Sequence, residues 1–185
     1  EPLQRGTLQA TLDELGLQPV QGGILGRARY AEDSLQAAIR EVGVRQFVIL
    51  GAGNDSFLLR RADLLESLQV FELDHPASQS AKREKLRELG FAGHPNAHFV
   101  GVDFERESAG EALARSGFDR ESPAFFSWLG VVTYLSREAI FGTLRSLREG
   151  AAVDSRVVFD YPIAPHLLRL EDRARSQQVS RSTAE

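Results

Sequence analysis

The first residues suited to ligand chemistry form a glycine turn, Gly51-Ala52-Gly53, directly after the apolar run 46–50. Glycines there let the backbone approach a ligand and adopt dihedral angles that other residues avoid. A helix following the turn would point its N-terminal N–H groups at the same place. Ser56 stands three residues after Gly53, where a complete dinucleotide fingerprint has Gly or Ala, so the pattern suits a nucleoside without a buried pyrophosphate. A plain tight turn is the alternative.

An acidic residue follows the second apolar run. Asp74 lies 21 residues after Gly53, at the end of the run 70–73, where a carboxylate can accept hydrogen bonds from both ribose hydroxyls. Glu72 is two residues earlier and therefore on the same face of a strand, which makes it a weaker candidate. Asp74 could also cap a helix beginning at Pro76, and the two roles are compatible.

A second carboxylate, in Asp103-Phe104, follows the run 98–102. Asp103 could accept a hydrogen bond from the exocyclic amine of adenine while Phe104 covers the ring. The alternative is a solvated Asp that opens the acidic loop 103–107. Three strand ends that present two glycines, Asp and Asp in turn form a more specific pattern than any one of them. Upstream, Arg27 could grip a carboxylate with its guanidinium, although the chain is rich in exposed arginine candidates.

These residues need a parallel sheet to bring them together. Amphipathic stretches predict helices that end at Gly43, span 57–68, run from Pro76 to Gly90, and run from Ser136 to Gly150. Short apolar runs predict strands at 46–50, 70–73, 98–102, 124–128 and 156–159. The alternation predicts an α/β fold, a Rossmann-like doubly wound sheet of at least five parallel strands, in which ligands bind beyond the carboxyl ends.

Composition argues against several other classes. The chain has 185 residues, of which 42% are hydrophobic and 26% charged, as is typical of one globular domain. A net charge of −4 argues against a nucleic-acid partner held by bulk phosphate attraction. No apolar run approaches the roughly 18 residues of a membrane helix, so no membrane partner is expected. The absence of cysteine excludes disulfides and thiolate metal sites and favours a cytoplasmic location.

No metal site is expected either. His94 and His98 have the spacing of ligands on one face of a helix, but Gly93 and Pro95 oppose a helix there.

Four segments together resemble the class I S-adenosylmethionine-dependent methyltransferases related to leucine carboxyl methyltransferases, including their bacterial O-methyltransferase branch. Two of their motifs, Gly-Ala-Gly-Asn-Asp and Glu-Leu-Asp-His-Pro, are quite specific to this family. The matching segments are 27–33, 45–55, 71–76 and 128–135.

The resemblance implies S-adenosyl-L-methionine as cofactor and a small-molecule acceptor as partner. By position, Gly51, Ala52 and Gly53 would line the methionine part, Arg27 would hold the cofactor carboxylate, Asp74 the ribose, and Asp103 with Phe104 the adenine. Tyr134 and Tyr161 are weaker candidates for contact with the acceptor or the sulfonium, and half-buried packing is their alternative. No catalytic residue is predicted. The family often has Glu-Gly where this chain has Leu129-Gly130, so one polar contact near the methionine part is missing.

The implied activity is methyl transfer to a carboxylate or hydroxyl oxygen of a small-molecule or carboxyl-bearing acceptor. The alternatives are an NAD(P)-binding oxidoreductase domain, which Ser56 disfavours, and a non-catalytic cofactor-binding domain. The expected organisation is an N-terminal helical or loop segment at 1–29, the cofactor-binding domain at 30–162 and a polar tail at 163–185. The antiparallel hairpin that ends the family fold is not visible after Pro162.

Overall fold

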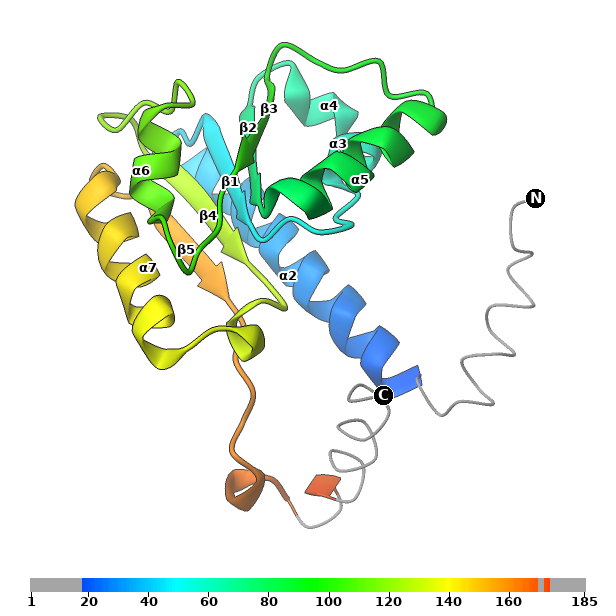
Figure 1. Ribbon diagram of the computed structural model, residues 1–185, viewed down its shortest axis with the longest axis vertical. Coiled ribbons are helices and arrows are strands. Elements are labelled where there is room, and N and C mark those ends of the chain that lie inside the picture. The colour runs from blue at the N-terminus through cyan, green and yellow to red at the C-terminus, as the bar shows by residue number, and fades with distance from the viewer. Residues whose placement is uncertain (1–17, 170–171, 174–185) are drawn as a thin grey trace. The chain divides into compact units, whose positions relative to one another are not determined.

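The computed structural model describes residues 18–169 and 172–173 (Figure 1). The chain divides into two compact units, one of Ala31–Asp160 and one of Glu1–Tyr30 with Tyr161–Glu185. A single helix, α2 (Gln18–Val42), crosses the first boundary between the units. Much of the predicted N-terminal segment and most of the predicted polar tail lie outside the described residues. The expected boundaries at 29/30 and 162/163 therefore stay predictions.

The unit Ala31–Asp160 is built on a sheet of parallel strands in the order β3-β2-β1-β4-β5. This confirms the predicted doubly wound α/β fold, and all pairings among the described strands are parallel. The strands are β1 (Gln46–Leu50), β2 (Gln69–Asp74), β3 (Ala97–Gly101), β4 (Ala124–Trp128) and β5 (Arg156–Phe159). Every residue of β1 and β4 is buried, which is why these two strands are almost entirely apolar in sequence, with Gln46 and Ser127 as the exceptions.

Helices cover both faces of the sheet. Figure 1 shows α6 (Ala109–Ala114) and α7 (Arg137–Gly150) on one side and the helices α3 to α5 on the other. The first pair encloses a core that includes Phe71, Phe126 and Trp128. On the opposite face, residues of α2 beyond Ala31 join α3 (Phe57–Arg60), α4 (Ala62–Leu65) and α5 (Pro76–Glu88) over a second core. Two short 3-10 turns, η1 (Val132–Tyr134) and η2 (Pro165–Leu167), complete the described elements.

The prediction of one continuous helix over 57–68 is wrong. The chain forms α3 and α4 instead, separated at Arg61, whose φ of −123° and ψ of 39° are not helical. In one continuous helix Arg61 would lie four residues from both Phe57 and Leu65, in the middle of the buried face. At the break, the Arg61 guanidinium contacts Glu32 at 3.8 Å and Asp63 at 2.9 Å.

In the part of the chain that the structure describes, no helix combines the length and the apolar character that crossing a membrane requires.

Candidate functional site

Backbone hydrogen bonds join the carboxyl ends of the first three strands. The N–H groups of Gly51 and Ala52 donate to the Leu73 carbonyl oxygen at 2.7 and 3.1 Å, which links the ends of β1 and β2. The N–H of Val102 donates to the Asp74 carbonyl oxygen at 2.8 Å and links β3 to β2. The three predicted segments therefore meet at one edge of the sheet.

The glycine turn has the conformation that its sequence suggests. Gly51 and Gly53 have φ values of +66° and +46°, in the left-handed region that disfavours side chains. A Cβ on Gly51 would lie 2.4 Å from Cγ2 of Val131, so the turn also packs tightly against the segment after β4. A Cβ on Gly53 would meet only the Gly51 carbonyl oxygen, at 3.9 Å, so Gly53 faces open space.

Asp74 is tied to this turn by its side chain. Its Oδ2 accepts a hydrogen bond from the Gly53 N–H at 2.5 Å, and its Oδ1 accepts from the N–H of His75 at 2.7 Å. The N-cap of α5 is His75, whose Nδ1 accepts from the Ala77 N–H at 3.3 Å. The alternative role of Asp74 as the helix cap is therefore not what the structure shows. Each carboxylate oxygen keeps acceptor capacity for a ligand.

Asp103 lies at the start of the loop after β3. Its Oδ1 accepts from the Glu105 N–H at 3.1 Å, and its Oδ2 lies 3.4 Å from Nε of Arg106. The side chain retains about a third of its exposure, so it is neither buried nor fully solvated. Phe104 is partly buried against the core beneath α6 and α7.

An open cleft of about 280 Å³ lies at these strand ends. Six predicted site residues line it together: Gly51, Gly53, Asp74, Asp103, Phe104 and Tyr134. The cleft is completed by His75, next to Asp74, and by residues that the sequence did not single out as lining: Ser78, Val102, Glu105, Val131 and Leu135. Their shared signal is position, because each lies within four residues of a strand end or in the segment 131–135 after β4.

Three predicted residues do not line this cleft. The side chain of Ala52 is buried in the core on the opposite face of the sheet, so only its backbone lies beside the cleft. Arg27 and Tyr161 belong to the other compact unit, and their roles stay predictions.

Glu72 is separated from the cleft, contrary to its interpretation as a weaker ribose candidate. Its carboxylate is buried beneath α5, where Oε2 lies 2.6 Å from Nζ of Lys82, and Gln79 donates to its carbonyl oxygen at 3.2 Å. Burial raises the pKa of Glu72 to about 7, because desolvation outweighs the attraction of Lys82 and because Asp55 and Asp74 add repulsion. Glu72 acts as a core carboxylate.

His94 and His98, which have the spacing of helical metal ligands, contact other side chains and backbone groups instead of each other. His98 Nε2 lies 2.6 Å from Oε1 of Gln69, and its ring stacks on Phe71 with centroids 4.6 Å apart. His94 accepts the N–H of Asn96 through Nδ1 at 3.2 Å. Among the described residues, no group of three or more His, Cys, Asp or Glu lies close enough to hold a metal ion.

A larger cleft of about 430 Å³ is lined by residues of α6 and α7, and its polar side chains include Arg120, Arg145 and Ser146. It contains none of the strand-end residues. The smaller cleft is the candidate site because the glycine turn and both strand-end carboxylates converge there.

A doubly wound parallel sheet with a glycine turn and two acidic strand ends around one cleft defines a class of protein that binds nucleoside cofactors at the carboxyl edge of the sheet. The particular family follows from the sequence. The family model for leucine carboxyl methyltransferase matches residues 3–148, and this chain belongs to that family. The resemblance noted from the motifs is thereby confirmed.

Curated relatives agree with this assignment. The YktD protein of Bacillus subtilis (strain 168), provisionally named an S-adenosyl-L-methionine-dependent methyltransferase, is 40% identical over 137 residues, covering 74% of this chain and 44% of the relative. SCO7813 of Streptomyces coelicolor, with the same provisional description, is 36% identical over 134 residues, covering 72% of this chain and 46% of the relative. This chain thus spans about half the length of the curated relatives that it matches.

Solved structures support the fold alone. A provisionally described O-methyltransferase of Nostoc punctiforme superposes with a TM-score of 0.55 at 15% identity, covering 82% of this chain and 42% of that one. The apo form of the S-adenosylmethionine-dependent methyltransferase SibL gives a TM-score of 0.52 at 17% identity, covering 73% and 36%.

Proposed function

We propose that this chain is an S-adenosyl-L-methionine-dependent methyltransferase whose cofactor binds in the cleft at the ends of β1, β2 and β3. The observation that carries the proposal is the convergence of Gly53, Asp74 and Asp103 on one cleft, with the Asp74 carboxylate fixed at 2.5 Å by the Gly53 N–H. The membership of the chain in the leucine carboxyl methyltransferase family supports the same cofactor.

The cleft fits this cofactor in charge and in form. Its titratable side chains are the carboxylates Asp74, Asp103 and Glu105, with His75 and Tyr134, and it has no Lys or Arg among its lining residues. Such a lining favours a ligand that carries positive charge, as a sulfonium does. Its volume of about 280 Å³ lies just below the range usual for ligand pockets, roughly 300–1,000 Å³.

The predicted residues would then divide the cofactor among them. Asp74 would accept the ribose hydroxyls through the lone pairs that Gly53 and His75 leave available. Asp103 would accept the exocyclic amine of adenine, and Phe104 would cover the ring. Gly51 and Gly53 would admit the methionine part, beside the backbone of Ala52. By the family resemblance, Arg27 is the candidate for the cofactor carboxylate.

When bound, S-adenosyl-L-methionine supplies a methyl group activated by the positive charge on its sulfur. The chain therefore contributes alignment and exclusion of water rather than covalent help. Val102, Val131 and Leu135 give the cleft apolar walls that restrict water near the reacting atoms. Tyr134, whose side chain is 83% exposed at the mouth, is placed to contact an acceptor.

The proposed acceptor is an oxygen, either a carboxylate or a hydroxyl, on a small molecule or a carboxyl-bearing compound. The family description, which specifies a carboxyl group, supports a carboxylate first. A carboxylate acceptor needs no general base, whereas a hydroxyl acceptor does.

The test measures binding of S-adenosylhomocysteine, the demethylated form of the cofactor, by calorimetry and thermal unfolding. Ligand at about 100 times its Kd should stabilise the fold by roughly 2.7 kcal/mol, which raises the Tm by several degrees. Asp74→Ala should weaken binding at least tenfold. Asp63→Ala is the matched control, because Asp63 is an exposed carboxylate paired with Arg61 outside the cleft.

Three outcomes would each contradict part of the proposal. Stabilisation by NAD but not by S-adenosylhomocysteine would favour the oxidoreductase alternative. Equal affinity of the Asp74→Ala and Asp63→Ala variants would refute the ribose assignment. Binding without methyl transfer to any carboxylate or hydroxyl acceptor would support the non-catalytic alternative.

A further inference from the structure

The loop between β3 and α6 carries both residues that we assign to adenine. It begins after Gly101, the last residue of β3, and ends at Glu107, which precedes Ser108, the N-cap of α6. Within it, the N–H groups of Arg106 and Glu107 donate to the Asp103 carbonyl oxygen, both at 2.9 Å. These local bonds shape the loop around Asp103, but they do not fix the distance between its two ends.

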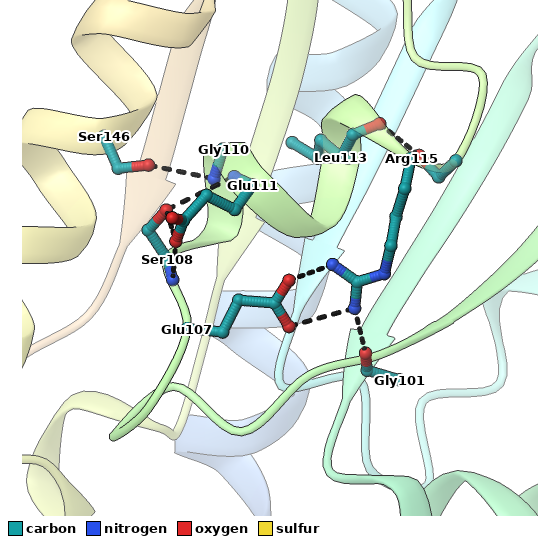
Figure 2. A network of polar contacts seen from close by, with 9 residues as sticks. Gly101, Glu107, Ser108, Gly110, Glu111, Leu113, Arg115 and Ser146 are labelled. Atoms are coloured by element: carbon teal, nitrogen blue, oxygen red, sulfur yellow. Dashed lines mark hydrogen bonds and ion pairs between the residues drawn. The ribbon is translucent and has the colours of Figure 1, made fainter.

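A single guanidinium joins those ends. Figure 2 shows Arg115, the C-terminal cap of α6, reaching back to both of them. Its Nη2 donates to the Gly101 carbonyl oxygen at 2.7 Å and to Oε2 of Glu107 at 2.9 Å. Its Nη1 donates to Oε1 of the same carboxylate, so the contact with Glu107 is bidentate.

The chain just after Glu107 is anchored independently. Ser108 and Glu111 form a capping box, in which the Glu111 N–H donates to Ser108 Oγ at 3.2 Å and the Ser108 N–H donates to Glu111 Oε2 at 2.9 Å. The N–H of Gly110 donates to Oγ of Ser146 on α7 at 2.9 Å, which fixes the start of α6 against its neighbour (Figure 2). With α6 anchored in this way, the Arg115 bridge determines how β3 and the loop meet it.

We propose that Arg115 is a positioning residue for adenine recognition: by holding Gly101 and Glu107 on one guanidinium, it fixes the place of Asp103 and Phe104 in the cleft. The inference rests on the proposed function. Arg115 is absent from the cleft lining, so it acts through the loop and not by contact with the cofactor.

The geometry requires an arginine. The planar guanidinium presents several N–H donors in a fixed fork, which can serve one carboxylate in a bidentate manner and a carbonyl oxygen at the same time. A lysine ammonium could neutralise Glu107, but it has no such fork, so Arg115→Lys should recover only part of the effect.

The experiment compares two ligands that differ at the exocyclic position of the purine. S-adenosylhomocysteine carries the amine that Asp103 would accept, whereas S-inosylhomocysteine carries an oxygen there. Wild-type chain should prefer the adenine ligand. In Arg115→Gln, affinity for S-adenosylhomocysteine should fall about tenfold while affinity for the inosine analogue changes less, so the preference shrinks. Glu107→Gln should move the preference in the same direction by a smaller factor.

Arg120→Gln is the matched control. Arg120 is also an exposed arginine that donates to backbone carbonyls, but to Glu149 at 3.1 Å and Gly150 at 3.4 Å near the end of α7. It should leave both affinities unchanged. Hydrogen exchange adds a readout that needs no ligand, since the amides of Arg106 and Glu107 should exchange several-fold faster in the Arg115 and Glu107 variants than in the wild type.

The outcomes separate this inference from the proposed function. Wild-type chain that binds neither ligand refutes the proposed function and the adenine role together. Wild-type chain that prefers S-adenosylhomocysteine, with folded Arg115→Gln and Glu107→Gln variants that keep the full preference, overturns the positioning role alone. Should Arg115→Gln fail to fold, Glu107→Gln decides, because it leaves the arginine and the Gly101 contact in place.

Discussion

The glycine turn makes the sharpest prediction about the site, through the variant Gly51→Ala. Gly51 has a φ of +66°, and an added Cβ would lie 2.4 Å from Cγ2 and 3.2 Å from Cγ1 of Val131. Two separate penalties therefore act at this position. One is the conformational cost of alanine in the left-handed region, and the other is the displacement of a neighbouring side chain.

The first penalty can be measured by itself at Gly43. Gly43 has a φ of +70°, yet an added Cβ would meet no atom within 4 Å. Left-handed alanine costs about 1–2 kcal/mol, and the loss of unfolded-state entropy returns roughly 0.4–1 kcal/mol, so Gly43→Ala should destabilise the fold by about 1 kcal/mol. Overpacking against Val131 adds about 1–3 kcal/mol, which gives roughly 2–4 kcal/mol for Gly51→Ala.

Denaturant unfolding of both variants tests this difference directly. The double variant Gly51→Ala/Val131→Ala, together with Val131→Ala alone, completes a double-mutant cycle. Removing the γ-methyl groups of Val131 should recover most of the stability that Gly51→Ala loses through overpacking. Binding of S-adenosylhomocysteine provides the functional readout, and it should weaken in Gly51→Ala but not in Gly43→Ala, which lies outside the cleft.

Equal destabilisation by Gly51→Ala and Gly43→Ala would refute the close approach between the turn and Val131. Loss of stability in Gly51→Ala with unchanged ligand affinity would show instead that the turn serves packing alone.

Two further predictions concern the surroundings of the site. The pKa of Glu72 is raised by burial from 4.5 to about 7, so the folded chain holds this proton more tightly than the unfolded chain does. Its stabilising contribution is complete below pH 4.5 and disappears as the pH rises towards 7, a change of roughly 3 kcal/mol. Glu72→Gln should therefore gain stability relative to wild type between pH 5 and 8 in urea unfolding, and a constant difference would contradict the assignment. Ser108→Ala should cost about 1 kcal/mol by removing the cap of α6, measured as a shift of the urea midpoint, whereas no shift would show that the capping box contributes nothing.

The sheet could be predicted from sequence because its strands are short apolar segments, and because glycine or acidic residues mark the ends of the first three. Parallel strands place their carboxyl ends at one edge of the sheet. The sequence alone therefore predicts that Gly53, Asp74 and Asp103 lie near one another. The same reasoning was wrong for Glu72. Alternation along a strand identifies a face, but it does not show where a helix covers that face, and Lys82 of α5 encloses this carboxylate.

The helices were harder to predict where polar contacts determine the residues at which they begin and end. At the break, Arg61 contacts Asp63 and the distant Glu32, and apolar spacing alone, which suggested one helix, does not register such polar contacts. Helix α6 was missed because it is only 6 residues long, and the Ser108 to Glu111 capping box was its one local signal. The Arg115 bridge joins residues 8 and 14 positions away, and no periodic pattern marks such a contact.

The charge of the cleft places a requirement on the rest of the chain. Its lining carries three carboxylates and no arginine or lysine, which suits the sulfonium and ammonium groups of the proposed cofactor but leaves its carboxylate without a cationic partner there. A carboxylate that leaves water needs a charged or hydrogen-bonded partner, so its partner must come from outside these lining residues. Arg27, in the other compact unit, is the candidate that the family resemblance supplies. The adenosine half of the ligand would then be recognised within Ala31–Asp160, by Asp74, Asp103 and Phe104.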